Sequence, residues 1–180
     1  MKKLVLLMVL VAVVLFTAGC TDNLSGNSTS SDTGKEKSTI VMITQLEQIN
    51  TSLQNGPVFL KMGSIWCPAC RSMKPILERL AVEYGGNATI ASVDVDKNPG
   101  LAEYFGVEAI PDSCVIVGIE NGTYIYMQED GNVSMDRSQA RFVGLNDTGG
   151  TNNTDNNTDE KMFERVLNLA LLQQEKDKSK

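Results

Sequence analysis

The chain has 180 residues, enough for one ordinary domain with a hydrophobic core and some additional segments. It carries 22 acidic and 16 basic residues, and this negative balance argues against nucleic acid or an anionic lipid surface as the partner. The sequence has no histidine, which excludes histidine-based catalysis, histidine-ligated metals and haem held by a histidine of this chain.

The first 19 residues have the pattern of a signal peptide. Lys2 and Lys3 precede an apolar run, residues 4–16, that is shorter than the roughly 20 residues of a relaxed membrane span. Small residues then lead to Cys20 in a sequence similar to a lipobox, although Thr17 stands where leucine is usual. Lipidation at Cys20, ordinary secretory cleavage and an uncleaved anchor all remain open. All three place the domain outside the cytoplasm, and we expect it at the extracytoplasmic face of the membrane, held there by the lipid on Cys20 or by the signal segment.

Residues 20–38 are almost entirely small or polar, which predicts a flexible tether. The domain itself is expected over residues 39–180. It begins with a β-rich run at 39–43, followed by a helix for which Thr44 and Glu47 form a capping box and Gly56 the stop. An apolar run at 58–62 then predicts a central strand.

Immediately after this strand comes the pair Cys67 and Cys70, separated by Pro68 and Ala69, at the start of a helix expected to end near Tyr84. A Cys-x-x-Cys at a helix start indicates a redox centre. The unpaired N–H groups and positive dipole end of a helix stabilise a thiolate, so Cys67 is the expected nucleophile. Pro68 suits the first helical position, where no N–H is needed.

The remaining pattern alternates strands and helices and predicts an α/β layered domain. A third strand, a short helix and, after Ile110-Pro111, a fourth strand are followed by two hairpin turns, a last strand, a polar low-complexity loop at 146–157 and a final helix. The third strand is expected at 88–95, the short helix at 98–105 and the fourth strand at 113–119. The hairpin strands are expected at 124–128 and 133–135, and the last strand at 139–145. The final helix should begin at Thr158 or Asp159.

Five sequence pieces in the right order and spacing resemble the thioredoxin family, over about residues 39–145 plus the terminal helix. They are Trp66-Cys67-Pro68-Ala69-Cys70, Pro75, the run from Val93 to Pro99, Tyr104-Phe105-Gly106-Val107, and Ala109-Ile110-Pro111. The resemblance implies a central mixed β-sheet flanked by helices. It also implies a cis Ile110–Pro111 bond facing the two cysteines, in a chain that adds an extra β-hairpin before the last strand.

The chemistry implied is reversible thiol–disulfide exchange, with no cofactor beyond the cysteine pair itself. Cys67 attacks a partner disulfide and Cys70 resolves the mixed disulfide. Pro111 would offer a backbone edge to an extended partner segment, and Trp66 would form an apolar lip beside the sulfur, unless it packs as a core aromatic. We therefore take Cys67, Cys70, Pro111 and Trp66 as the candidate catalytic set.

Two other interpretations of the cysteine pair are weaker. A static disulfide at this spacing closes a very small loop and constrains the unfolded chain little. A closed zinc site needs four ligands, and the sequence has neither a histidine nor a second cysteine pair to supply them, so no metal is expected.

The residues between the cysteines bear on the direction of electron flow. Pro68-Ala69 is closer to membrane-anchored thioredoxin-like reductants than to thioredoxin itself, and Ala69 stands where oxidases and isomerases of the family commonly have histidine. We expect a reductant of exported protein disulfides, recharged by a membrane or soluble electron donor. An extracytoplasmic oxidase or isomerase, or a binding module with an inert disulfide, remains an alternative.

Two residues depart from simple expectations. Lys61 stands where cytoplasmic thioredoxins carry a buried acid; we expect its stem to pack and its ammonium to reach solvent, while a role as a cation or neutral base stays open. Cys114 lies in an apolar strand and is expected to be buried as a small hydrophobe rather than to react.

Nine Asn-x-Ser/Thr triplets occur in the chain, mostly in the expected tether, turns and loop. Random placement of this composition would give only about two. Together with the lipobox-like signal, they predict a glycoprotein on an archaeal cell surface.

Overall fold

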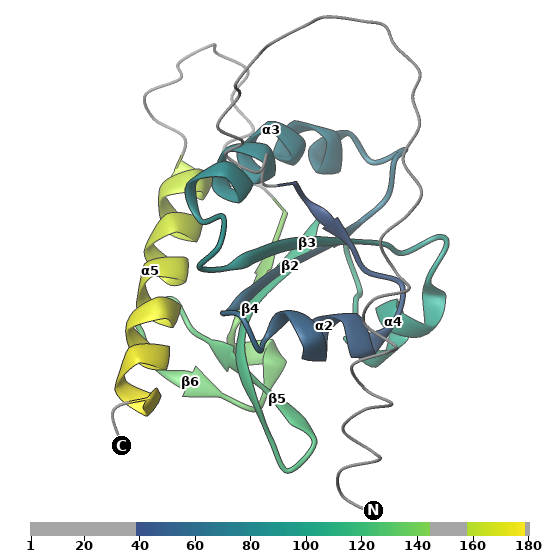
Figure 1. The fold of residues 1–180 in the computed structure, drawn as a ribbon. Coiled ribbons are helices and arrows are strands. Elements are labelled where there is room, and N and C mark those ends of the chain that lie inside the picture. Colours follow the sequence, from purple (N-terminus) through teal and green to yellow (C-terminus); the bar gives the residue numbers. More distant parts are fainter. Residues whose placement is uncertain (1–38, 145–157, 179–180) are drawn as a thin grey trace, which may run out of the picture. The chain divides into compact units, whose positions relative to one another are not determined.

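The structure is a computed structural model that describes residues 39–144 and 158–178 (Figure 1). The predicted signal peptide, Cys20, the tether and the 146–157 loop lie outside the described residues. The elements in chain order are β1 (Val41–Met42), α2 (Leu46–Ser52), β2 (Val58–Gly63), α3 (Pro68–Glu83), β3 (Thr89–Asp94), α4 (Pro99–Tyr104), β4 (Asp112–Glu120), β5 (Thr123–Met127), β6 (Val133–Ser134), a 3₁₀ turn η1 (Arg137–Gln139), β7 (Arg141–Val143) and α5 (Thr158–Lys178).

The strands form one mixed sheet in the order β1-β3-β2-β4-β5-β6. The pairs β1/β3 and β2/β3 are parallel, whereas β2/β4, β4/β5 and β5/β6 are antiparallel. β7 pairs with the first residues of β4, and β5 pairs with the later ones. This arrangement confirms the predicted mixed sheet with an extra hairpin before the last strand, and it places β2 and β4 at the centre.

Helices cover both faces of the sheet and bury a separate core on each (Figure 1). One core holds Val58, Leu60 and Met62 of β2 together with residues of α2 and α4. The other holds Phe59 of β2 with residues of α3 and α5, among them Phe163, whose ring centroid lies 4.9 Å from that of Phe59. Because side chains alternate along a strand, Lys61 points to the same face as Phe59, beneath α3.

The first strand and the first helix are shorter than predicted. The strand includes only Val41 and Met42, and Ile43 turns into the core. The expected capping box of Thr44 with Glu47 is wrong: the side chain of Gln48 closes the helix start, accepting from the N–H groups of Thr44 (2.7 Å) and Gln45 (3.0 Å). A glutamine amide oxygen satisfies free N–H groups there as a carboxylate would.

The two hairpin turns lie where the sequence predicted them. Asn121 and Gly122 join β4 to β5 with φ of 52° and 80°, the left-handed values that such a two-residue turn requires. Gly131, at φ 90°, lies in the turn between β5 and β6. The last strand is shorter than expected, because residues 137–139 form the 3₁₀ turn η1 before β7 begins.

Within residues 39–144 and 158–178, no helix is both long enough and apolar enough to cross a membrane.

Candidate dithiol site

The two cysteines lie at the first turn of α3, directly after the loop that follows β2. Cys67 is the N-cap residue and Pro68 the first residue of the helix, as predicted. The backbone N–H of Cys70 donates to Cys67 Sγ at 3.2 Å. This bond places a backbone donor against the Cys67 sulfur at the N-terminus of α3. Both residues are free thiols and both are buried.

Trp66 lies on the surface beside Cys67, since 63% of it is exposed. The alternative of a core aromatic is therefore wrong. The indole Nε1 donates to Asp96 Oδ2 at 2.8 Å, and Ser64 Oγ also donates to Asp96 Oδ2. Asp96 follows β3, so this contact fixes the loop before the motif to the neighbouring strand. With exposed Ile65, Trp66 makes an apolar surface next to the sulfur.

The Ile110–Pro111 bond is cis, as the family resemblance implied. Ile110 O lies 3.8 Å from Cys67 Sγ, so this bond faces the first cysteine. The carbonyl of Pro111 accepts from the N–H of Gly144 at 2.8 Å, which anchors the start of β4 to the end of β7. The structure thus brings Cys67, Cys70 and Pro111 together, with Trp66 at the exposed side.

Cys70 is as buried as Cys67 and lines a cavity of about 330 Å³ between α3, β2 and β3. Burial raises the pKa of the Cys70 thiol to about 11, and its hydrogen bond with Cys67 adds to this effect. A backbone hydrogen bond from Ser64 and, after it, the positive charge of Lys61 act in the opposite direction and lower the pKa. Cys70 therefore needs help to become a thiolate.

Lys61 is more deeply placed than the sequence suggested. It is only 7% exposed, and it lines the same cavity as Cys70. A Cβ placed on Gly63 would lie 2.5 Å from Lys61 Nζ and 2.7 Å from Cys70 Sγ. The ammonium and the thiol therefore occupy one small space above Gly63: the stem of Lys61 packs as expected, and its ammonium ends at the cavity that Cys70 also lines.

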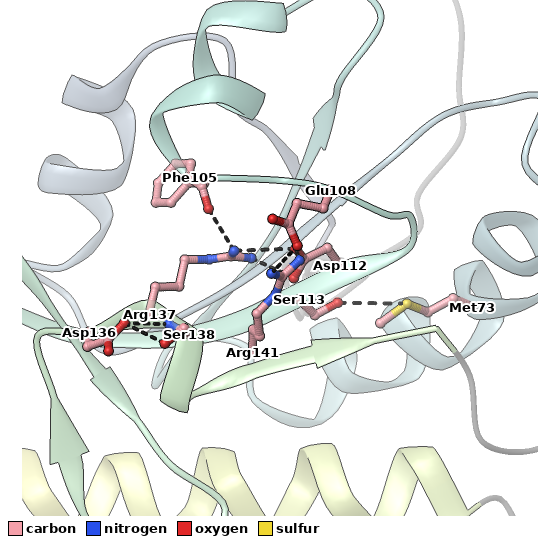
Figure 2. A network of polar contacts seen from close by, with 9 residues as sticks. All are labelled: Met73, Phe105, Glu108, Asp112, Ser113, Asp136, Arg137, Ser138 and Arg141. Carbon is pink, nitrogen blue, oxygen red and sulfur yellow. Dashed lines mark hydrogen bonds and ion pairs between the residues drawn. The ribbon is translucent and has the colours of Figure 1, made fainter.

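A second buried polar cluster lies just beyond Pro111 (Figure 2). The carboxylate of Asp112 is fully buried and accepts hydrogen bonds from Arg137 Nη2 at 2.6 Å and from Arg141 Nη2 at 2.7 Å. Arg137 also donates to Phe105 O at 2.7 Å, and Arg141 contacts Glu108 at 3.4 Å. Arg137 comes from η1 and Arg141 from β7, so the segment after the extra hairpin is fixed to the strand that follows Pro111.

Cys114 is fully buried in β4, as predicted. Burial raises the pKa of its thiol to about 11, although Arg137 opposes this shift. A buried thiol that keeps its proton at neutral pH is a poor nucleophile. Cys114 therefore belongs to the core and not to the reactive pair.

Sequence reasoning missed Asp96 and Asp112 at this end of the sheet. Asp96 stands in the Val93–Pro99 run that carried the family resemblance, so that run was the available signal. Asp112 follows Pro111 directly, but nothing local indicated that two arginines further along the chain would reach it. In the part of the chain that the structure describes, no three metal-ligating side chains gather.

Comparison with known proteins gives consistent matches. The family model described as Thioredoxin matches residues 40–135. Thioredoxin from Chlorobaculum thiosulfatiphilum is 38% identical over 61 residues, which are 34% of this chain and 56% of that protein. Thioredoxin from Staphylococcus saprophyticus is 38% identical over 72 residues, covering 40% of this chain and 68% of that protein. The first match thus spans little more than half the length of the relative.

Among solved structures, thioredoxin from Trypanosoma brucei brucei aligns with a TM-score of 0.50 at 15% identity. The alignment covers 74% of this chain and 96% of that one. At this identity the likeness concerns the fold alone, and it agrees with the mixed sheet and flanking helices described above.

Proposed function

The chain belongs to the thioredoxin family of thiol–disulfide oxidoreductases, and from this premise we propose that it reduces disulfide bonds of exported proteins through Cys67 and Cys70. The Cys67 thiolate attacks one sulfur of a partner disulfide, and the other partner sulfur leaves as a thiolate. Cys70 then attacks Cys67 Sγ, which releases the partner reduced and leaves a Cys67–Cys70 disulfide. The two sulfurs carry both electrons, so the step needs no cofactor.

The observation that carries this proposal is the environment of Cys67 Sγ. It accepts the Cys70 N–H at 3.2 Å at the N-terminus of α3, and it lies 3.8 Å from Ile110 O beside the cis bond. The first contact stabilises the attacking thiolate. The second places the sulfur beside the backbone of residues 110–111, along which an extended partner segment can lie next to Ile65 and Trp66.

The reducing direction is supported by the residue that stands before the second cysteine. Ala69 adds no positive charge next to Cys67, and the chain has no histidine that could provide one. Such a charge would stabilise the dithiol form and make the protein a stronger oxidant. Its absence favours a low reduction potential and hence electron donation to the partner.

The cellular placement is also part of the proposal. Residues 1–19 act as a signal peptide, Cys20 carries a lipid, residues 20–38 form a tether, and the domain works at the outer face of the membrane of an archaeal cell. The exposed positions of Asn50, Asn87, Asn121 and Asn132 support glycosylation, because glycans need accessible asparagines. Partners are then exported protein disulfides on one side and a membrane or soluble electron donor on the other.

The deciding experiment is a redox titration of the purified protein against glutathione, followed by mass-resolved labelling of Cys67 and Cys70. We expect one reversible two-electron couple, with a potential below that of glutathione if the protein is a reductant. A potential well above it would instead assign an oxidase or isomerase. If no reversible couple forms, the proposal is wrong and the pair is an inert disulfide.

Substitutions separate the roles of the two sulfurs. Cys67→Ser is expected to abolish reduction of insulin, while Cys70→Ser should accumulate mixed disulfides with partners. Cys114→Ser is the matched control, since it removes a thiol outside the reactive pair and should leave the couple intact. The membrane anchor is tested by comparing the membrane and soluble fractions of cells that express either Cys20→Ala or the unchanged protein. Loss of lipidation should release the variant from the membrane fraction.

A further inference from the structure

In the space above Gly63, the ammonium of Lys61 lies near the thiol of Cys70, which must lose its proton in the exchange reaction. Gly63 has no side chain, and this is what allows Lys61 Nζ and Cys70 Sγ to approach the same point from β2 and α3. Any larger residue at Gly63 would fill that point. The shared position of the two groups therefore depends on the missing side chain at the end of β2, directly before the motif.

The other charged groups around the cavity already have partners. Lys74 of α3 pairs with Glu78, and Arg71 donates to the carbonyls of Ile65 and Trp66 at 3.2 Å. Asp94 of β3 pairs with Lys97 at 3.1 Å.

Among the described residues, no carboxylate forms an ion pair with the Lys61 ammonium, which lines the cavity together with Cys70. Coulomb attraction between an ammonium and a thiolate is stronger in such a largely buried space than in bulk water, so an anion that forms beside Lys61 is stabilised. Cys70 is the group lining this cavity whose reaction creates such an anion.

We propose that Lys61 is a catalytic residue of the resolving step, in which its ammonium stabilises the thiolate of Cys70. This inference rests on the exchange reaction proposed above. In the mixed disulfide, Cys70 loses its proton to water in the cavity, and the thiolate attacks Cys67 Sγ. The Cys67–Cys70 bond forms, the bond from Cys67 to the partner breaks, and the partner sulfur leaves with the electron pair and takes a proton from solvent.

The need for such a group follows from the burial of Cys70. A thiol whose pKa is near 11 is almost entirely protonated at neutral pH, so the attacking form is rare. No carboxylate among the described residues lines the cavity except Asp94, which is engaged with Lys97 and would disfavour a nearby anion. The backbone N–H of Ser64 favours the anion, and among the side chains that line the cavity Lys61 is the cation whose charge acts on the Cys70 sulfur in the same direction.

The test follows both steps in one experiment. Reduced protein is mixed in a stopped-flow instrument with the aromatic disulfide DTNB. Attack by Cys67 releases one coloured thiolate, and resolution by Cys70 releases the second. A Cys67→Ser/Cys70→Ser variant measures how much coloured thiolate Cys20 and Cys114 release, and this baseline is subtracted. The first phase reports the nucleophile and the second reports the thiolate of Cys70.

Lys61→Met is expected to leave the first phase within about twofold and to slow the second by about three- to tenfold at neutral pH. A rise of one pH unit in the pKa of Cys70 removes about nine-tenths of its thiolate, and the greater nucleophilicity of a more basic thiolate restores part of the rate. The rise of the second-phase rate with pH should move upward by about one pH unit. Lys74→Met, which removes a paired lysine at the same cavity, should leave both phases unchanged.

The outcomes are distinct. If the unchanged protein shows no second phase, the proposed function itself fails. If it shows one and Lys61→Met has the same rate and pH profile, the role of Lys61 is wrong and the exchange reaction stands. Lys61→Gln provides a second neutral variant with the same expectation, in case the methionine variant does not fold.

Discussion

Two buried polar clusters lie on neighbouring central strands and differ in how their charges are matched. Lys61 on β2 has no carboxylate partner in the described parts of the chain, whereas Asp112 on β4 contacts two arginines. Met62 pairs with Asp112 across the ladder, so Asp112 faces the α2 and α4 side while Lys61 faces α3. A matched cluster holds segments together, and an unmatched charge remains available to a reaction.

The largest effect is expected from breaking the matched cluster. Asp112→Ala leaves Arg137 and Arg141 buried without their carboxylate and should lower the free energy of unfolding by about 3–5 kcal/mol. Chemical denaturation measures it. Glu120→Ala, at the exposed end of the same strand, should change stability by less than about 0.5 kcal/mol. A similarly small loss for Asp112→Ala would show that the cluster does not hold the fold.

A smaller loss is expected when one arm of the cluster is removed. Arg137→Met keeps much of the side-chain volume and leaves Asp112 with Arg141, so the free energy of unfolding should fall by about 1–3 kcal/mol. Arg79→Met, which breaks the more exposed pair with Glu160, is the control and should cost less than about 1 kcal/mol. Equal losses in denaturation curves for both variants would contradict the contrast between buried and surface pairs.

Cys114 lies beside the matched cluster and should make stability depend on alkaline pH. Its pKa is raised to about 11 in the folded protein from an ordinary value of 9.0, so the folded state keeps the proton that the unfolded chain loses. This contribution is fully present below about pH 9 and is lost as the pH rises toward 11.

Between about pH 8 and pH 10, the reduced protein should therefore lose about 1 kcal/mol more stability than Cys114→Ala. Urea denaturation at the two pH values checks this difference. The cavity left by the substitution lowers the free energy of unfolding of Cys114→Ala equally at both pH values, so it does not affect the change with pH that is compared. Parallel slopes would mean that the thiol of Cys114 does not titrate with unfolding.

The smallest effect belongs to the surface of the reactive site. Trp66→Phe keeps an aromatic ring but removes the bond from Nε1 to Asp96, and kcat/KM for insulin reduction should fall about two- to fivefold, corresponding to about 0.5–1 kcal/mol. Stability should stay within about 0.5 kcal/mol, since most of the ring is exposed. A loss of stability without a change in rate would make Trp66 a structural residue only.

Local patterns were sufficient for much of the fold. The Cys67–Cys70 spacing, Pro68 at the helix start and the Asn121-Gly122 turn each have a conformational reason that acts within a few residues, and the structure places all of them as predicted. The order of strands and helices followed from the same kind of pattern. The cis bond at Ile110–Pro111 required the family resemblance in addition.

Long-range contacts were not available from the sequence. The pairing of Asp112 with Arg137 and Arg141 depends on β7 joining the start of β4, and that register is decided by packing over the whole sheet. The depth of Lys61 depends on α3 lying over β2 and on the absence of a side chain at Gly63. Likewise, whether a lone tryptophan packs inside or lies on the surface depends on the contact between Ser64, Trp66 and Asp96.

The position of Trp66 also has an optical consequence. It is the sole tryptophan in the chain, it stands next to Cys67, and its indole is held by Asp96 rather than free to rotate. Tryptophan fluorescence of the protein therefore comes from Trp66 alone, and a Cys67–Cys70 disulfide would lie close enough to quench it. Fluorescence of the unlabelled protein should report the state of the sulfur pair directly, in a cuvette and in real time.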